Sequence, residues 1–116
     1  MDSKNYHIAV NCFYRYIYLY QGSNLLNTYP IGIGKAATPA PVGEYLVIKK
    51  VFNPPLATFG TRSLHLSNTI TCIHGTNNPS SIGRLVPDGC ISMHNKDIEE
   101  LFELVEIGTP VIIFFD

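Results

Sequence analysis

Short alternating segments separated by turn residues constrain the fold of this chain most. Within the segment 14–20, Tyr16, Tyr18 and Tyr20 alternate with Ile17 and Leu19, so the two groups point to opposite faces of an extended backbone. The segment 6–11 alternates in the same way, and QGSN (21–24) supplies turn residues before LLNTYPIGIG (25–34). This pattern predicts consecutive short β-strands joined by hairpins.

Further strand signals continue along the chain. They are EYLVIKKVF (44–52), TRSLHLS (61–67) and NTITCIH (68–74), with KAATPAPVG (35–43) as a loop and NPPL (53–56) as a break. The alternation in 68–74 places Ile70, Cys72 and His74 on one face. The continuous apolar run PVIIFF (110–115) predicts a closing strand buried on both faces.

One helix is predicted between these last two strands. Asn95 is a favourable N-cap, and acidic residues follow it in the first turns, where the helix dipole favours anions. An apolar face at i, i+3, i+4 and i+7 spacing consists of Ile98, Leu101, Phe102 and Val105, and Gly108 lies just beyond the end. The expected fold class is therefore mainly β, with one short helix near the C-terminus.

Length and charge limit the organisation and the partners. A chain of 116 residues predicts a single domain over 1–116. The formal charge of -1, from 8 basic and 9 acidic residues, argues against a nucleic-acid groove or a polybasic membrane anchor. No apolar run approaches the ~20 residues of a transmembrane segment, and the N-terminus lacks the pattern of a signal peptide. Three cysteines are too few for a disulfide framework.

The Gly- and Pro-rich loop HGTNNPSSIGRLVPDGC (74–90) begins with a histidine and ends with a cysteine. Cys90 follows a tight-turn sequence, where backbone N–H groups can bind an oxyanion. His74 is a candidate base that can accept the thiol proton. The alternative interpretation is a small buried cysteine and a structural histidine at a strand end.

A metal site is a second use of the same residue types. Cys72 and His74 form C-x-H, and Cys90 and His94 form C-x3-H, so four N/S ligands are available for tetrahedral zinc. The spacing is not one of the common zinc patterns. We expect Cys72 to pack in the core beside the site instead.

These residues and their order resemble the catalytic domain of L,D-transpeptidases, the YkuD family. The family's signature is H-G-T, a loop ending in S-I-G, then S/T-H-G-C-[IV]-R-[ML]-x-N, a helix and G-T-P-V. This chain carries IHGTNNPSSIG (73–83) and PDGCISMHNKDIEELFELVEIGTPVII (87–113), preceded by TPAPVGEY (38–45) and FGTR (59–62). The resemblance covers the whole chain and implies a β-sandwich-like fold with a short helix.

The resemblance also implies an activity. Family members transfer an acyl group of peptidoglycan stem peptides to a cysteine thiolate with release of D-alanine, and then to an amine, which forms a 3→3 cross-link. Stem peptides are the implied partners, carbapenem-type compounds the implied inhibitors and the bacterial cell envelope the implied location. No cofactor and no metal is implied. The oligomeric state cannot be read from the sequence.

By position, Cys90 corresponds to the nucleophile and His74 to the catalytic histidine, with the Gly75 carbonyl orienting its ring. The backbone N–H groups of Gly89 and Cys90 correspond to the oxyanion donors. The positions expected to contact substrate are Thr76, Ser81, Gly83, Asp88, Ser92 and Asn95.

Two positions depart from the signature. Asp88 replaces the histidine two before the cysteine, and Ser92 replaces the arginine two after it. An anion near the thiol raises its pKa, whereas an arginine lowers it. Three hypotheses follow: a slow or substrate-shifted enzyme, a charge restored by Arg84, or a cell-wall peptide-binding module without catalysis. A papain-like peptidase is a weaker alternative, because such enzymes place the cysteine before the histidine.

Overall fold

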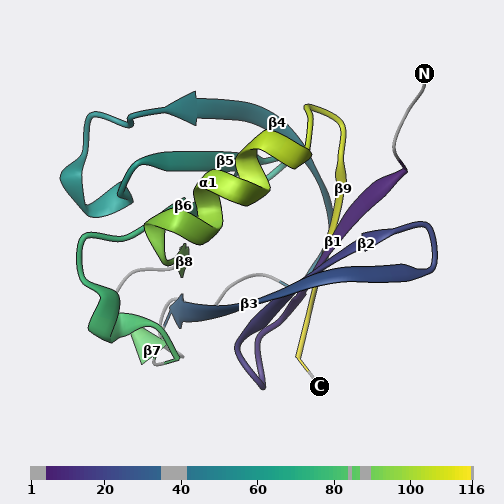
Figure 1. Ribbon diagram of the computed structural model, residues 1–116, viewed down its shortest axis with the longest axis horizontal. Helices are drawn as coiled ribbons and strands as arrows, with labels where there is room; N and C mark the ends of the chain where they lie inside the picture. Colours follow the sequence, from purple (N-terminus) through teal and green to yellow (C-terminus); the bar gives the residue numbers. More distant parts are fainter. Residues whose placement is uncertain (1–4, 35–41, 84, 87–89, 116) are drawn as a thin grey trace.

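The computed structural model describes residues 5–34, 42–83, 85–86 and 90–115 (Figure 1). It is mainly β with one short helix, which confirms the predicted fold class. The elements are β1 (Tyr6–Asn11), β2 (Tyr16–Gln21), β3 (Asn24–Gly34), β4 (Gly43–Phe52), η1 (Ala57–Phe59), β5 (Arg62–Leu66), β6 (Cys72–Gly75), η2 (Pro79–Ser81), β7 (Leu85–Val86), β8 (Ile91–Met93), α1 (Asn95–Leu104) and β9 (Pro110–Phe114).

The strands form two sheet regions that share their longest members. The order is β2-β1-β9-β4-β5-β6-β8-β3-β7, and β3 also pairs with β2. β4 pairs with β9 through its first residues and with β5 through its later ones, with a register shift between Val47 and Lys49. Likewise β3 pairs first with β2 and then with β8. Because β3 and β4 pass from one region to the other, the two regions enclose a common core (Figure 1).

Side-chain alternation fills this core. On β2, Ile17 and Leu19 are fully buried, whereas Tyr16 is 40% exposed, as the alternation predicts. On α1, Ile98, Leu101 and the following Val105 are fully buried, which confirms the predicted apolar face. The helix contacts mainly β5 and β6, so it covers one face of that region. Within the described part of the chain, no helix has the length and apolar character to cross a bilayer.

Three local predictions are wrong. The N-cap of α1 is His94 rather than Asn95. Asn95 is the first helical residue, and its Oδ1 accepts a hydrogen bond from the Thr61 N–H at 3.1 Å. Local capping rules predict that the Asn95 side chain caps the helix. Instead, it forms a tertiary hydrogen bond with the segment before β5.

The other two errors concern strand limits and burial. β6 begins only at Cys72, so Ile70 lies in the preceding turn and is 98% exposed instead of sharing a face with Cys72. β9 is not buried on both faces, because Val111 and Ile113 are buried but Ile112 is 40% exposed. β9 lies between β1 and β4, and only one face of that region turns toward the core.

Close backbone packing joins the segment before β5 to the end of β6. Gly60 has φ +63°, and a Cβ there would lie 2.5 Å from the carbonyl carbon of Gly75 and 2.6 Å from the Thr76 nitrogen, besides meeting Asn95 Oδ1. Neither backbone atom can move without displacing the strand that carries His74. Gly60 is therefore required both for its left-handed backbone conformation and for the space it leaves.

We expect Gly60→Ala to lower the free energy of unfolding by about 3 kcal/mol, as the sum of backbone strain and overpacking. Gly108→Ala is the matched control, because Gly108 also has positive φ but a Cβ there meets nothing within 4 Å. Its cost is that of strain alone, about 1–2 kcal/mol. Urea unfolding of both variants measures the difference. Equal losses would contradict the close packing around Gly60.

Candidate active site

The three strands β5, β6 and β8 carry an apolar face and a polar face. Leu64 pairs with Ile73, and Ile73 with Ile91, and all three are fully buried. Their neighbours along each strand point the other way. The residues of this polar face are Ser63, His65, Cys72, His74 and Ser92, aligned by the pairs Ser63–His74, His65–Cys72 and His74–Ser92.

Cys90 joins the polar face at the start of β8. Its Sγ lies 3.6 Å from Sγ of Cys72. The two sulfur atoms and a ring nitrogen of His74 all lie within 4.8 Å of one another. The structure thus brings His74 and Cys90 together from the two ends of the long loop, because β6 and β8 run parallel and adjacent.

Two contacts fix the ring of His74, which is only 3% exposed. Nδ1 lies 2.5 Å from the carbonyl oxygen of Gly75. Since a carbonyl oxygen only accepts, Nδ1 carries the hydrogen, and Nε2 has the lone pair in the neutral ring. The Phe59 ring stacks on the imidazole at a centroid distance of 4.5 Å and an interplanar angle of 11°. The tautomer and the ring plane are therefore both set by neighbours.

Hydrogen bonds stabilise the thiolate form of Cys90. The bond with the Cys72 side chain is the largest influence and lowers the pKa of Cys90, whereas burial opposes it. A hydrogen bond with His74, another with the Cys72 backbone and the charge of His74 lower it further, to about 4. The thiolate, which is the nucleophilic form of cysteine, is therefore the stable form of Cys90 at neutral pH.

The other titratable groups nearby behave differently. Burial and the charge of Lys49 lower the pKa of His65, so this imidazole is neutral at pH 7. Its Nε2 lies 3.3 Å from Ser63 Oγ. Cys12 belongs to the apolar core, and burial raises the pKa of its thiol to about 11. Among the thiols with an altered pKa, only that of Cys90 is shifted toward reactivity.

Three of the other predicted site residues form hydrogen bonds that stabilise the loop after β6. Thr76 Oγ1 accepts a hydrogen bond from the Asn78 N–H at 3.0 Å, and Ser81 Oγ donates to the Asn78 carbonyl at 2.8 Å. The Gly83 N–H donates to the Ile31 carbonyl at 2.8 Å. These bonds give the loop a defined shape.

The remaining predicted positions differ in their relation to the thiol. Ser92 is 4% exposed and lies on the polar face beside His74. Asn95 and Thr76 line a hollow with Pro30, Pro79 and His94 rather than lying in the sulfur–imidazole cluster. Asp88 and Gly89, as well as Arg84, lie outside the described residues.

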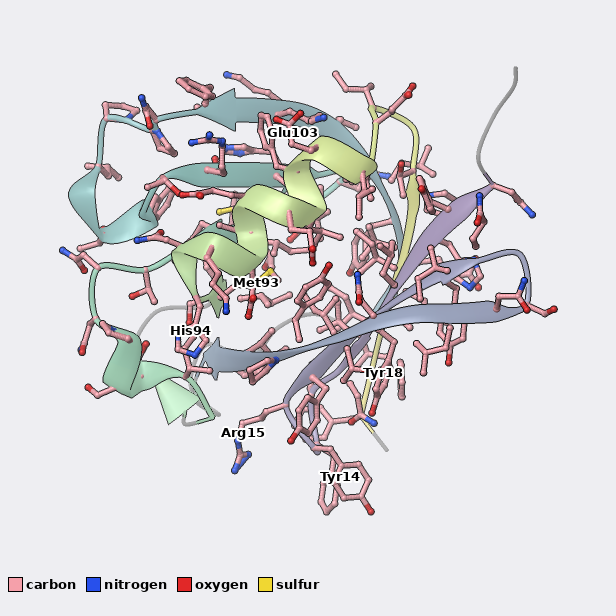
Figure 2. The ribbon with its side chains drawn as sticks, viewed as in Figure 1. Tyr14, Arg15, Tyr18, Met93, His94 and Glu103 are labelled. Carbon is pink, nitrogen blue, oxygen red and sulfur yellow. The ribbon has the colours of Figure 1, made fainter. Side chains whose placement is uncertain are left out.

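The structure does not support the four-ligand zinc site that the sequence allowed. Among the described residues, the group of closely spaced ligand atoms comprises Cys72, His74 and Cys90 and does not include His94. His94 is the N-cap of α1 and lies at the N-terminal end of the helix (Figure 2). The C-x3-H spacing therefore does not assemble the four-ligand site that the sequence allowed.

Three features of the site were not predicted from the sequence. Alternation in TRSLHLS could have placed Ser63 and His65 on one strand face, but their pairing with β6 depends on tertiary structure. The stacking of Phe59 has no sequence signal, because Phe59 belongs to the short η1 turn outside every periodic segment. Cys72 was expected beside the site, but its contact with Cys90 follows only from strand register.

Comparison with known proteins agrees with this geometry. A family model described as the L,D-transpeptidase catalytic domain matches residues 5–113. A Bacillus licheniformis protein named as the L,D-transpeptidase YkuD is 46% identical over 112 residues, which are 97% of this chain and 67% of the relative. A Bacillus subtilis protein of the same name is 46% identical over 93% of this chain and 65% of its own length. The chain thus spans about two thirds of these relatives.

Solved structures show the same fold. The catalytic domain of the E. faecium L,D-transpeptidase, determined by NMR and acylated by ertapenem, superposes with a TM-score of 0.80 at 26% identity, covering 98% of this chain and 100% of that one. The family match over nearly the whole chain and the close YkuD relatives lead to one conclusion: this chain belongs to the YkuD family of L,D-transpeptidase catalytic domains.

Proposed function

We propose that the chain is a cysteine-dependent L,D-transpeptidase that acts on peptidoglycan stem peptides. The observation that supports this most is the cluster of the Cys90 and Cys72 sulfur atoms and the His74 imidazole within 4.8 Å. It combines a nucleophile, a base and, through the Gly75 carbonyl, a group that orients the base. The location would then be the cell envelope, where the substrate is.

The first half of the reaction forms a thioester. The Cys90 thiolate attacks the carbonyl carbon that links the third stem residue to D-alanine, and the carbonyl electron pair moves to oxygen. Backbone N–H groups of Gly89 and Cys90 are the expected donors to that oxyanion. The carbon–nitrogen bond then breaks, and protonated His74 donates a proton to the departing D-alanine amine.

The second half of the reaction regenerates the Cys90 thiolate. An amine of a second stem peptide attacks the thioester carbonyl, His74 accepts a proton from that amine, and the carbon–sulfur bond breaks to regenerate the thiolate. The product is a 3→3 cross-link. Burial of the imidazole and its stacking on Phe59 keep the ring plane constant through both proton transfers.

A peptide-binding module without catalysis is the second candidate. The observation in its favour is Ser92, which is buried on the polar face where the family signature has an arginine. That arginine would add positive charge near the thiolate. The lowered pKa of Cys90 favours the enzyme, because the hydrogen bonds with Cys72 and His74 oppose the effect of burial.

A carbapenem distinguishes the two candidates. We expect purified protein mixed with ertapenem to gain one drug mass per chain, measured by intact-mass spectrometry, because the thiolate opens the β-lactam ring. Cys90→Ala removes the nucleophile and should show no adduct. Cys12→Ala is the matched control, since it removes a thiol from the core and leaves the polar face unchanged. A folded wild type without adduct would favour the binding module.

The pH dependence of Cys90 alkylation tests the thiolate directly. Because the pKa is lowered to about 4, deprotonation is nearly complete at neutral pH. The iodoacetamide rate should therefore be constant from about pH 6 upward and fall as pH decreases through the lowered pKa, whereas an ordinary thiol gains rate near its pKa of about 8.5. Rates are measured by peptide mass, with Cys90→Ala as background. A rise in rate through pH 8–9, near the ordinary value, would contradict the lowered pKa.

A further inference from the structure

We propose that Cys72 is a positioning residue whose buried thiol donates its hydrogen to the Cys90 sulfur and holds that sulfur as the thiolate. This inference rests on the proposed function and assigns a role to a cysteine that lies beside the nucleophile. The supporting observations are the distance between the sulfur atoms, the strand register and the difference in exposure between the two cysteines.

Strand register fixes the distance between the sulfur atoms. β6 and β8 are parallel, with Ile73 opposite Ile91 and His74 opposite Ser92. Cys72 is the first residue of β6 and Cys90 directly precedes β8, so the same register continued by one residue brings them opposite each other. The resulting separation of the sulfur atoms, 3.6 Å, is within hydrogen-bonding range for sulfur. The contact therefore follows from the register at the point where β8 begins.

The difference in surroundings decides which sulfur is ionised. Two thiolates at this distance would repel each other strongly, so only one is deprotonated at a time. Cys72, the first residue of β6, is 2% exposed, whereas Cys90, just before β8, is partly exposed. A charge is less favourable on the more buried Cys72, and the His74 imidazole lowers the pKa of Cys90. Cys72 is consequently the donor and Cys90 the acceptor.

Among the described residues of the polar face, few other groups could perform this role. The facing side chains are His65 on β5, which is neutral and next to Cys72 in register, and Ser92, which is uncharged. Lys49 on β4 is exposed and pairs with His65 rather than with Cys72. A thiol hydrogen bond to a thiolate in this partly buried site is strong, because a charge-assisted bond is about twice as strong as a neutral one.

The test compares the Cys90 titration in the wild type and in three variants. Cys72→Ala removes the donor, Cys72→Ser replaces it with a hydroxyl, and Cys12→Ala removes a thiol from the core. Thiolate formation is followed by ultraviolet absorbance and by iodoacetamide rate as a function of pH, with a phosphine reductant and a chelator present so that both cysteines stay reduced and metal-free. Neither readout needs a peptidoglycan substrate.

We expect Cys72→Ala to raise the apparent pKa of Cys90 by about one unit, which is the size of one charge-assisted hydrogen bond. The backbone contribution of Cys72 remains in this variant, so the shift is partial. Cys72→Ser should return the apparent pKa toward the wild-type value, and Cys12→Ala should leave it unchanged. If Cys72→Ala does not fold, Cys72→Val removes the donor while filling the space.

The outcomes separate this inference from the proposed function. A low wild-type pKa that stays low in Cys72→Ala and in Cys72→Val would overturn the role of Cys72 and leave the proposed enzyme intact. A rise that Cys72→Ser does not reverse would also overturn it, because loss of packing would then explain the shift. An ordinary wild-type pKa would overturn the inference as well, and ertapenem acylation would still decide whether Cys90 is a nucleophile.

Discussion

The parallel pairing of β6 with β8 is the constraint on which the site depends. Parallel neighbours need a long connection, and here that connection is the loop from His74 to Cys90. The register places the loop's two ends on adjacent strands and directs both side chains to the same face. A shift of one residue would turn Cys90 toward the apolar core and leave Ile91 on the polar face.

The apolar face of the same strands makes this register stable. Leu64, Ile73 and Ile91 are fully buried, and α1 packs over β5 and β6 with Ile98 and Leu101. Any slip in pairing would expose these side chains, at a cost of about 1.5–3 kcal/mol each. The hydrophobic core thus fixes the alignment of groups that lie on the opposite side of the sheet. Close packing of Gly60 joins the segment before β5 to the end of β6. The hydrogen bond of Asn95 joins the helix to that same segment.

The electrostatics of the site follow from partial burial. An isolated buried thiolate is costly, and burial alone raises a thiol pKa, as it does for Cys12. Cys90 differs because it has a side-chain donor, a backbone donor and an imidazole close by. The stacked Phe59 and the Gly75 carbonyl hold that imidazole in place. Reactivity here is therefore a property of the neighbours that the sheet brings together.

The sequence by itself determined the alternation of the strands, the apolar face of the helix and the family signature around His74 and Cys90, because periodicity and motif order are local properties of the chain. Only the tertiary structure decided that Asn95 bonds to Thr61 instead of capping the helix, that one face of β9 is open and that Cys72 lies against Cys90. Each of these depends on how the helix and the strands pack together, and residues far apart in sequence acquire their partners only through that packing.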